Sequence, residues 1–136
     1  MRIVVVDPGH GPRSQIAEAL LAVELSGAAE VISAGTTPGD ELAGVAEVLE
    51  EIGLRWQPDR RELAGIASPP PDVLIAVCEE GCPACPYLPG SRRVVRWPFA
   101  EPPPAGAPDR LASLRAIRDG LAAHVRAWVA DRPAAN

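Results

Sequence analysis

The chain has 136 residues, of which 47% are hydrophobic and 23% are charged, and its formal net charge is −5. A chain of this length buries about two-thirds of its unfolded surface on folding, so one domain needs no disulfide staples. The acidic balance argues against a nucleic-acid partner, because phosphate contacts need clustered positive charge. No apolar run approaches the roughly 20 residues that cross a bilayer, which argues against a membrane partner.

The N-terminal apolar stretch is too short for a signal peptide, because polar residues follow directly after 3–6. We therefore expect a cytoplasmic protein with one domain over residues 1–132 and a disordered tail at 133–136. No pattern in the chain indicates an oligomeric state.

Hydrophobic periodicity and chain-breaking residues predict the secondary structure. In chain order, we expect a strand at 3–6, a helix at 13–25, a strand at 31–33, a helix at 42–52 ended by Gly53, a short helix at 59–66, a strand at 72–77, a strand at 93–97, an extended proline-rich stretch at 98–108 and a helix at 111–130. Continuously apolar strands that alternate with helices are typical of a parallel sheet. The sequence therefore predicts a single three-layer α/β domain, with a four-stranded parallel sheet flanked by helices on both faces.

The loop after the first strand is a candidate anion site. It reads Asp7-Pro8-Gly9-His10-Gly11-Pro12-Arg13-Ser14 and leads into a predicted helix. Ligands of parallel sheets bind beyond the carboxyl ends of the strands. A helix N-terminus offers free amides and the positive end of a dipole, and Arg13 adds a fixed charge.

Residues 4–19 resemble the opening of low-molecular-weight tyrosine phosphatases and thioredoxin-coupled arsenate reductases, which carry Cys-x5-Arg-Ser here before a helix reading Gln-x-Ala-Glu-Ala. Further matches follow in order at Ser33–Thr36, Glu51–Gly53, Asp72–Ile75, Cys78, Cys85-Pro86, Trp97 and Glu101-Pro102. The resemblance covers nearly the whole chain and implies the fold of these proteins. It also implies ligand-binding roles for Gly9, Gly11, Arg13, Ser14 and Trp97.

Four loop residues depart from the family pattern. Asp7 stands where the family has its nucleophilic cysteine, so the thiol-based reduction of arsenate and the standard hydrolysis of tyrosine phosphate are not expected here. Pro8 and Pro12 remove two amide donors from the loop. His10 replaces the asparagine that braces the loop in the family.

Two interpretations of this loop follow. In the first, the chain is a repurposed enzyme for a small, perhaps anionic molecule. Asp7 then acts as acid/base or nucleophile, with His10, Arg13 and Glu101 as the other catalytic residues. In the second, Asp7 pairs with Arg13 and fills the anion site, and the chain is a pseudoenzyme that binds a ligand or a partner.

The three cysteines, Cys78, Cys82 and Cys85, form a separate candidate site. By resemblance, Cys78 and Cys85 match the pair that arsenate reductases use to pass on the oxidising equivalent. Cys82 and Cys85 also form a C-x-x-C spacing, which is used for disulfide exchange and for metal pairs. Three thiols would suit zinc or an iron–sulfur cluster, with Asp7 or His10 as a fourth ligand. Inert, reduced cysteines are the remaining interpretation, and no cofactor is certain.

Overall fold

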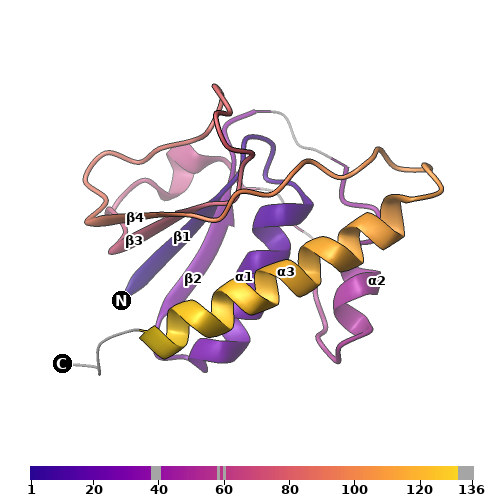
Figure 1. Ribbon diagram of the computed structural model, residues 1–136. Coiled ribbons are helices and arrows are strands. Elements are labelled where there is room, and N and C mark those ends of the chain that lie inside the picture. Colours follow the sequence, from indigo (N-terminus) through magenta and orange to yellow (C-terminus); the bar gives the residue numbers. More distant parts are fainter. Residues whose placement is uncertain (38–40, 58, 60, 132–136) are drawn as a thin grey trace.

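The computed structural model describes residues 1–37, 41–57, 59 and 61–131, so the predicted tail at 133–136 lies outside the described residues. The chain forms one parallel sheet with helices packed on it (Figure 1). In chain order the elements are β1 (Arg2–Val6), α1 (Pro12–Leu25), β2 (Glu30–Ala34), α2 (Val45–Glu50), the 3₁₀ helix η1 (Leu63–Ile66), β3 (Val73–Ala76), β4 (Arg93–Arg96) and α3 (Arg110–Asp131).

The sheet has the strand order β2-β1-β3-β4, and every pair of neighbours is parallel. Its two central strands are buried on both faces from Ile3 and from Val73 onward, which explains why residues 3–6 and 73–75 consist only of Val, Ile and Leu. The outer strand β4 is mostly exposed and carries arginine at both ends. The prediction of a four-stranded parallel sheet is confirmed.

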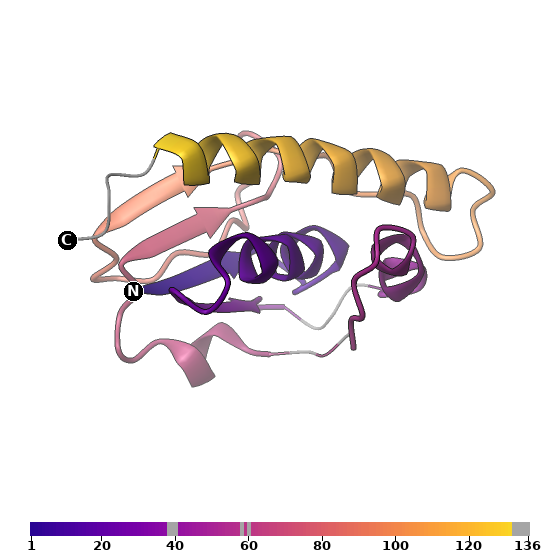
Figure 2. The same ribbon diagram turned by 90° about the horizontal axis from the view of Figure 1, so that it is seen from below.

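The two faces of the sheet are covered differently. Ile3, Val5 and Ile75 point to the face covered by α1, α2 and α3, which holds the larger hydrophobic core. Val4 and Leu74 point to the opposite face, where η1 and the loop around residue 88 cover a smaller core. Figure 2 shows α3 and η1 on opposite sides of the sheet. Helices were predicted on both faces, but η1 is the only helix in the second layer of the described chain.

Two predicted helices are shorter in the structure. The helix expected at 42–52 is regular only from Val45 to Glu50, because Gly44 has a left-handed φ of +89° and starts the helix late. The helix expected at 59–66 is reduced to four residues. Glu62 forms a parallel bridge with Gly35, and Leu63 N donates to Gly35 O at 2.8 Å. This extended pairing excludes helical geometry before Leu63.

The carboxyl ends of the four parallel strands meet at one edge of the sheet. The loops at 7–11, 77–92 and 97–109 all start from this edge and form the upper rim of the molecule in Figure 1. The fold therefore brings the Asp7 loop, the cysteines and Glu101 to the same end of the sheet. In the described part of the chain, no helix combines the length and apolarity that a bilayer crossing requires.

Candidate functional site

Asp7 lies inside the loop that joins β1 to α1, with its carboxylate fully buried. Gly11 N donates to Asp7 Oδ1 at 2.8 Å, and Ser14 N donates to Asp7 Oδ2 at 2.9 Å. Hydrogen bonds from amides to a carboxylate are about twice as strong as those between neutral groups. The side chain also neutralises the free N–H groups at the start of α1, where Pro12 has none of its own.

Asp7 therefore takes the position that an external oxyanion would occupy at this helix N-terminus. This matches the second interpretation of the loop, in which the chain fills its own anion site. The expected ion pair between Arg13 and Asp7 is not formed, because Arg13 Nη1 donates instead to Phe99 O at 2.9 Å. A substrate can reach the Asp7 carboxylate only if the loop opens.

His10 is 2% exposed and fixes the loop from within. Arg61 N donates to His10 Nδ1 at 2.7 Å, so Nδ1 is the unprotonated nitrogen and the proton lies on Nε2. Nε2 then donates to Ser33 Oγ at 2.7 Å, and Ser33 Oγ donates to Glu18 Oε1 at 2.8 Å. This chain of hydrogen bonds ties the loop to β2, α1 and the segment before η1. We call these four residues the loop brace.

Glu18 is the charged end of the loop brace. It accepts Ser33 N at 2.6 Å and Arg61 Nη1 at 3.3 Å in addition to the Ser33 hydroxyl. Burial raises the pKa of Glu18 from its ordinary value, although the bonds from Ser33 and the charge of Arg61 oppose the rise. Glu18 and Arg61 were not predicted as site residues, because these pairings join distant parts of the chain. The one signal for Glu18 was its place in the Gln-x-Ala-Glu-Ala stretch that resembles the family.

Gly35 allows the loop to approach β2 closely. A Cβ at this position would lie 2.3 Å from His10 N and 2.7 Å from Pro8 O, both backbone atoms. Thr36 N and Thr37 N each donate to Pro8 O at 2.9 Å across the same contact. Pro8 therefore removes an amide donor but supplies the carbonyl that locks the loop to the end of β2.

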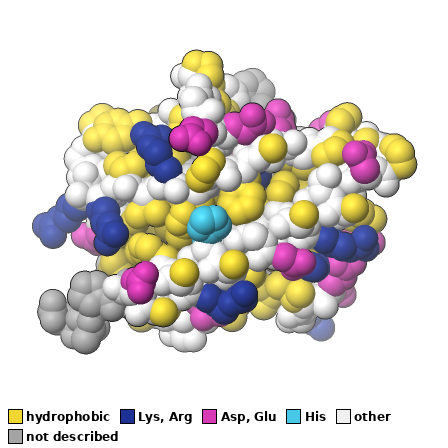
Figure 3. All heavy atoms as spheres, in the orientation of Figure 1, with side chains coloured by type: hydrophobic (Ala, Val, Ile, Leu, Met, Phe, Trp, Pro, Cys, Tyr) yellow, Lys and Arg dark blue, Asp and Glu magenta, His cyan; other side chains and the backbone are white. Residues whose placement is uncertain are grey.

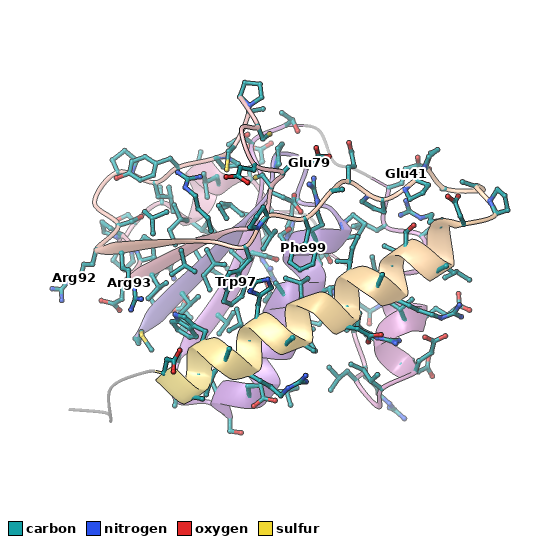
Figure 4. All side chains as sticks on the ribbon, viewed as in Figure 1. Glu41, Glu79, Arg92, Arg93, Trp97 and Phe99 are labelled. Atoms are coloured by element: carbon teal, nitrogen blue, oxygen red, sulfur yellow. The ribbon has the colours of Figure 1, made fainter. Side chains whose placement is uncertain are left out.

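Arg13 and Glu101 line one hollow at the rim, which we call the acid hollow. Its volume is about 390 Å³, and its walls are Pro8, Arg13, Glu79, Glu80, Gly81, Cys82, Pro83 and Glu101. Glu79 stands at this rim (Figure 4), and acidic side chains gather along the upper edge of the face in Figure 3. Asp7 and His10 are not among the lining residues. The acid hollow therefore does not bring Asp7 and His10 together with Glu101.

The cysteines line a second hollow, which we call the thiol hollow. Its volume is about 510 Å³, and its walls are Ala76, Cys78, Glu79, Glu80, Gly81, Cys82, Cys85, Arg96 and Pro98. The two hollows share the residues 79–82, so they lie on either side of one turn. Cys82 N donates to Glu79 O at 3.1 Å within this turn.

Cys78 and Cys85 meet in the thiol hollow but differ in environment. Cys78 is 4% exposed, and burial together with the adjacent Cys85 thiol raises the pKa of Cys78 well above its ordinary value. Cys85 is half-buried, and Arg96 Nη1 donates to its Sγ at 3.9 Å. The pair combines a buried protonated thiol with an accessible sulfur beside a guanidinium. All three cysteines are free thiols.

Metal binding by Cys78, Cys82 and Cys85 finds no geometric support. Among the described residues, no three His, Cys, Asp or Glu side chains form a group that could hold a metal ion. Asp7 and His10, the suggested further ligands, are engaged with loop amides and with the loop brace. A zinc or iron–sulfur site at these cysteines stays a prediction without support here.

The remaining predicted ligand-binding residues contact other parts of the fold. Gly9 is buried, and Gly11 and Ser14 direct their amides to Asp7. Trp97 is 5% exposed and stacks on His124, with ring centroids 5.5 Å apart. Figure 4 shows Trp97 between the sheet and α3. It belongs to the larger hydrophobic core and lines neither hollow at the rim.

Among known proteins, several solved structures have a fold similar to that of this chain. No protein-family model matches the chain, and no curated protein sequence matches it. An arsenate reductase from Archaeoglobus fulgidus DSM 4304 is 25% identical with a TM-score of 0.77, over 96% of this chain and 100% of that one. A thioredoxin-dependent arsenate reductase from Corynebacterium glutamicum is 25% identical with a TM-score of 0.70, over 95% of this chain and 60% of that one. A tyrosine phosphatase from Erwinia amylovora is 21% identical with a TM-score of 0.68, over 96% of this chain and 93% of that one.

Proposed function

We propose that this chain, which has the fold of arsenate reductases and low-molecular-weight tyrosine phosphatases, is a thiol–disulfide exchange protein that acts through Cys78 and Cys85. One observation carries the proposal: the two thiols meet in one open hollow, and Arg96 donates to the more accessible of them. The protein is then a repurposed enzyme whose chemistry has moved from the β1–α1 loop to the loop after β3.

The burial of Asp7 supports the proposal that the chemistry takes place at the cysteines and not in the β1–α1 loop. Both of its carboxylate oxygens are held by loop amides, at 2.8 and 2.9 Å. A nucleophile or general base must come within hydrogen-bond reach of its substrate. A catalytic role for Asp7, His10 or Glu101 on an anionic substrate is therefore not part of this proposal.

The environments of the two thiols assign their order of action. Cys85 attacks first, because it is half-buried and has the Arg96 guanidinium beside its sulfur. An external disulfide must reach the attacking sulfur, and the sulfur of Cys85 is the more accessible of the two. Cys78 acts second, because burial keeps its sulfur protonated and out of reach of an external disulfide.

The exchange transfers two electrons. Cys85 Sγ attacks one sulfur of a disulfide R–S–S–R, the substrate S–S bond breaks, and one thiolate leaves and is protonated. Cys78 then loses its proton and attacks Cys85 Sγ, which expels the second thiol and forms a Cys78–Cys85 disulfide. The substrate is reduced to two thiols, and a low-molecular-weight thiol or a dithiol protein must return two electrons for the next turnover. The Corynebacterium protein is named as thioredoxin-dependent, so a reductant of that class is one to test.

The test is to mix the reduced protein with hydroxyethyl disulfide, trap free thiols with iodoacetamide and map the peptides by mass spectrometry. The expected product is a Cys78–Cys85 disulfide. In Cys78→Ser, the mixed disulfide should persist on Cys85, because the thiol that displaces it in this proposal is absent. Cys82→Ser is the matched control and should still form the Cys78–Cys85 bond. A disulfide that includes Cys82, or three thiols that remain free, would overturn the proposal.

A further inference from the structure

The acid hollow carries a second inference, which rests on the proposed exchange function and names its substrate class. We infer that the substrate is a small disulfide bearing an α-amino acid group, as in cystine. Its carboxylate and ammonium bind in the acid hollow, and its S–S bond extends over the shared turn at 79–82 toward Cys85 in the thiol hollow. Four observations lead to this assignment.

The first observation is the state of Arg13. This side chain is 5% exposed, its Nη1 is bonded to Phe99 O, and its buried Nε has no hydrogen-bond partner in the described part of the chain. Burial of a guanidinium is unfavourable unless its donors are paired. The Nε edge is thus unpaired but covered, and a carboxylate reaches it, with two parallel hydrogen bonds, once the side chains at the wall of the acid hollow shift.

The second observation is that no described carboxylate takes this edge. The Asp7 oxygens are held by Gly11 N and Ser14 N, although Asp7 lies in the same loop. Arg13 is nevertheless among the residues that line the acid hollow. A carboxylate supplied by a bound molecule would therefore satisfy a buried donor that the fold leaves unpaired.

The third observation is the net charge of the acid hollow. Three of its lining residues are acidic, Glu79, Glu80 and Glu101, against the single cation Arg13. Glu79 Oε1 accepts Glu101 N at 3.1 Å, which holds the two acidic residues next to each other at the rim. A simple oxyanion meets net repulsion in such a cavity, whereas an ammonium group beside the carboxylate of the ligand is attracted. The hollow is thus complementary to a zwitterion.

The fourth observation is that the acid hollow and the thiol hollow share one wall. Glu79, Glu80, Gly81 and Cys82 line both hollows. A molecule anchored at Arg13 that extends beyond this turn enters the cavity that contains Cys78 and Cys85. An amino acid whose side chain ends in a disulfide has this layout. Its exchange then follows the balanced two-electron step given above and releases two molecules of the amino-acid thiol.

The experiment compares four disulfides that differ only in charged groups: cystine, cystamine, 3,3′-dithiodipropionate and hydroxyethyl disulfide. The rate of Cys78–Cys85 disulfide formation is measured for each and divided by the rate of the same disulfide with free glutathione, which removes differences in intrinsic reactivity. We expect cystine to react at least about tenfold faster than dithiodipropionate on this normalised scale, which corresponds to about 1.4 kcal/mol. Equal normalised rates would overturn the zwitterion site and leave the exchange function intact.

Variants test which residues cause the preference for cystine. Arg13→Gln should lower the ratio of the cystine rate to the hydroxyethyl disulfide rate. Glu101→Gln, at an exposed residue, should lower the same ratio without a folding defect. Glu24→Gln is the control, because Glu24 is exposed on α1 and lies outside both hollows. An unchanged ratio in both Arg13→Gln and Glu101→Gln would overturn the inference.

A ligand that binds but cannot exchange separates the proposed zwitterion site from the proposed exchange function. Cystathionine is a thioether with two amino acid ends and cannot exchange. Calorimetric titration should detect its binding to the wild type and a loss of binding in Arg13→Gln and Glu101→Gln. If cystathionine binds in this manner while no disulfide oxidises Cys78 and Cys85, the zwitterion site stands and the exchange function fails. If cystathionine does not bind and cystine shows no preference, the site is overturned.

Discussion

The Asp7 carboxylate and the Ser14 amide are joined by a hydrogen bond of 2.9 Å, so the first turn of α1 is closed by an acid from the same chain. Gly11 N donates to the other oxygen of Asp7 at 2.8 Å. The partial positive charge of the helix N-terminus is thus neutralised inside the fold. Two consequences follow for measurement: removing Asp7 destabilises the loop, and it creates a vacant anion site.

We expect Asp7→Ala to lower the free energy of unfolding by about 3 kcal/mol, since two charge-assisted hydrogen bonds are lost and two buried amides remain unpaired. Urea denaturation measures this difference. Added sulfate should restore stability to the variant by binding to the vacated amides. Because sulfate stabilises proteins in general, the wild type in the same buffers is the control. Equal responses of the two proteins to sulfate would show that Asp7 does not occupy an anion site.

Gly35→Ala tests the contact between the Asp7 loop and β2. The added Cβ would lie 2.3 Å from His10 N and 2.7 Å from Pro8 O, and backbone atoms cannot turn away as a side chain can. We expect a loss of about 3 kcal/mol or more in the free energy of unfolding. Gly65→Ala is the matched control, since no heavy atom lies within 4 Å of its added Cβ, and it should change stability by less than about 0.5 kcal/mol. Similar losses in both variants would contradict the proposed close packing.

Glu18→Gln tests the charged end of the loop brace. Burial raises the pKa of Glu18 in the folded state above its ordinary value of 4.5, so the folded protein binds this proton more tightly than the unfolded chain. The stability from this group is therefore complete below pH 4.5 and is lost as the pH rises through the folded pKa. Urea titrations between pH 4 and 7 should show that the difference in stability, wild type minus Glu18→Gln, falls as the pH rises. A difference that does not depend on pH, or one that grows with pH, would refute the raised pKa.

The sequence predicted the elements that depend on local pattern. Unbroken runs of Val and Ile identified the central strands, and the 3.6-residue period identified α1 and α3, because burial imposes these patterns directly. The loop brace was not predicted, because Ser33 bonds to residues 23 and 15 positions away in the chain and such pairings leave no periodic signal. The second interpretation of the loop pairs Arg13 with Asp7, but Arg13 Nη1 donates to Phe99 O, which the fold brings near from 86 residues away in the chain.

The pairing of the cysteines likewise depends on contacts that leave no periodic signal in the sequence, although the location of the cysteines and of Glu101 could be predicted. Their position at one edge of the sheet followed from the rule that parallel strands share their carboxyl ends. The resemblance indicated the pair Cys78 and Cys85, whereas the C-x-x-C spacing indicated Cys82 and Cys85, and the sequence did not decide between the two pairs. That choice depends on the turns after β3, where Cys82 N bonds to Glu79 O and Cys85 N bonds to Cys82 O. Side-chain direction in such a loop is set by tertiary contacts.

Selective alkylation tests the different environments of the cysteines. Iodoacetamide reacts with the thiolate, and burial raises the pKa of Cys78 while covering its sulfur. In the native protein we expect Cys82 and Cys85 to be labelled at least about tenfold faster than Cys78 at pH 8, as measured by peptide mass spectrometry over time. The labelling rate of Cys78 should keep rising at more alkaline pH, as its thiolate forms. In urea the three rates should converge, because the unfolded chain exposes all three thiols. Labelling of Cys78 at the rate of Cys85 in the native protein would contradict both its burial and its assigned role as the second thiol to act.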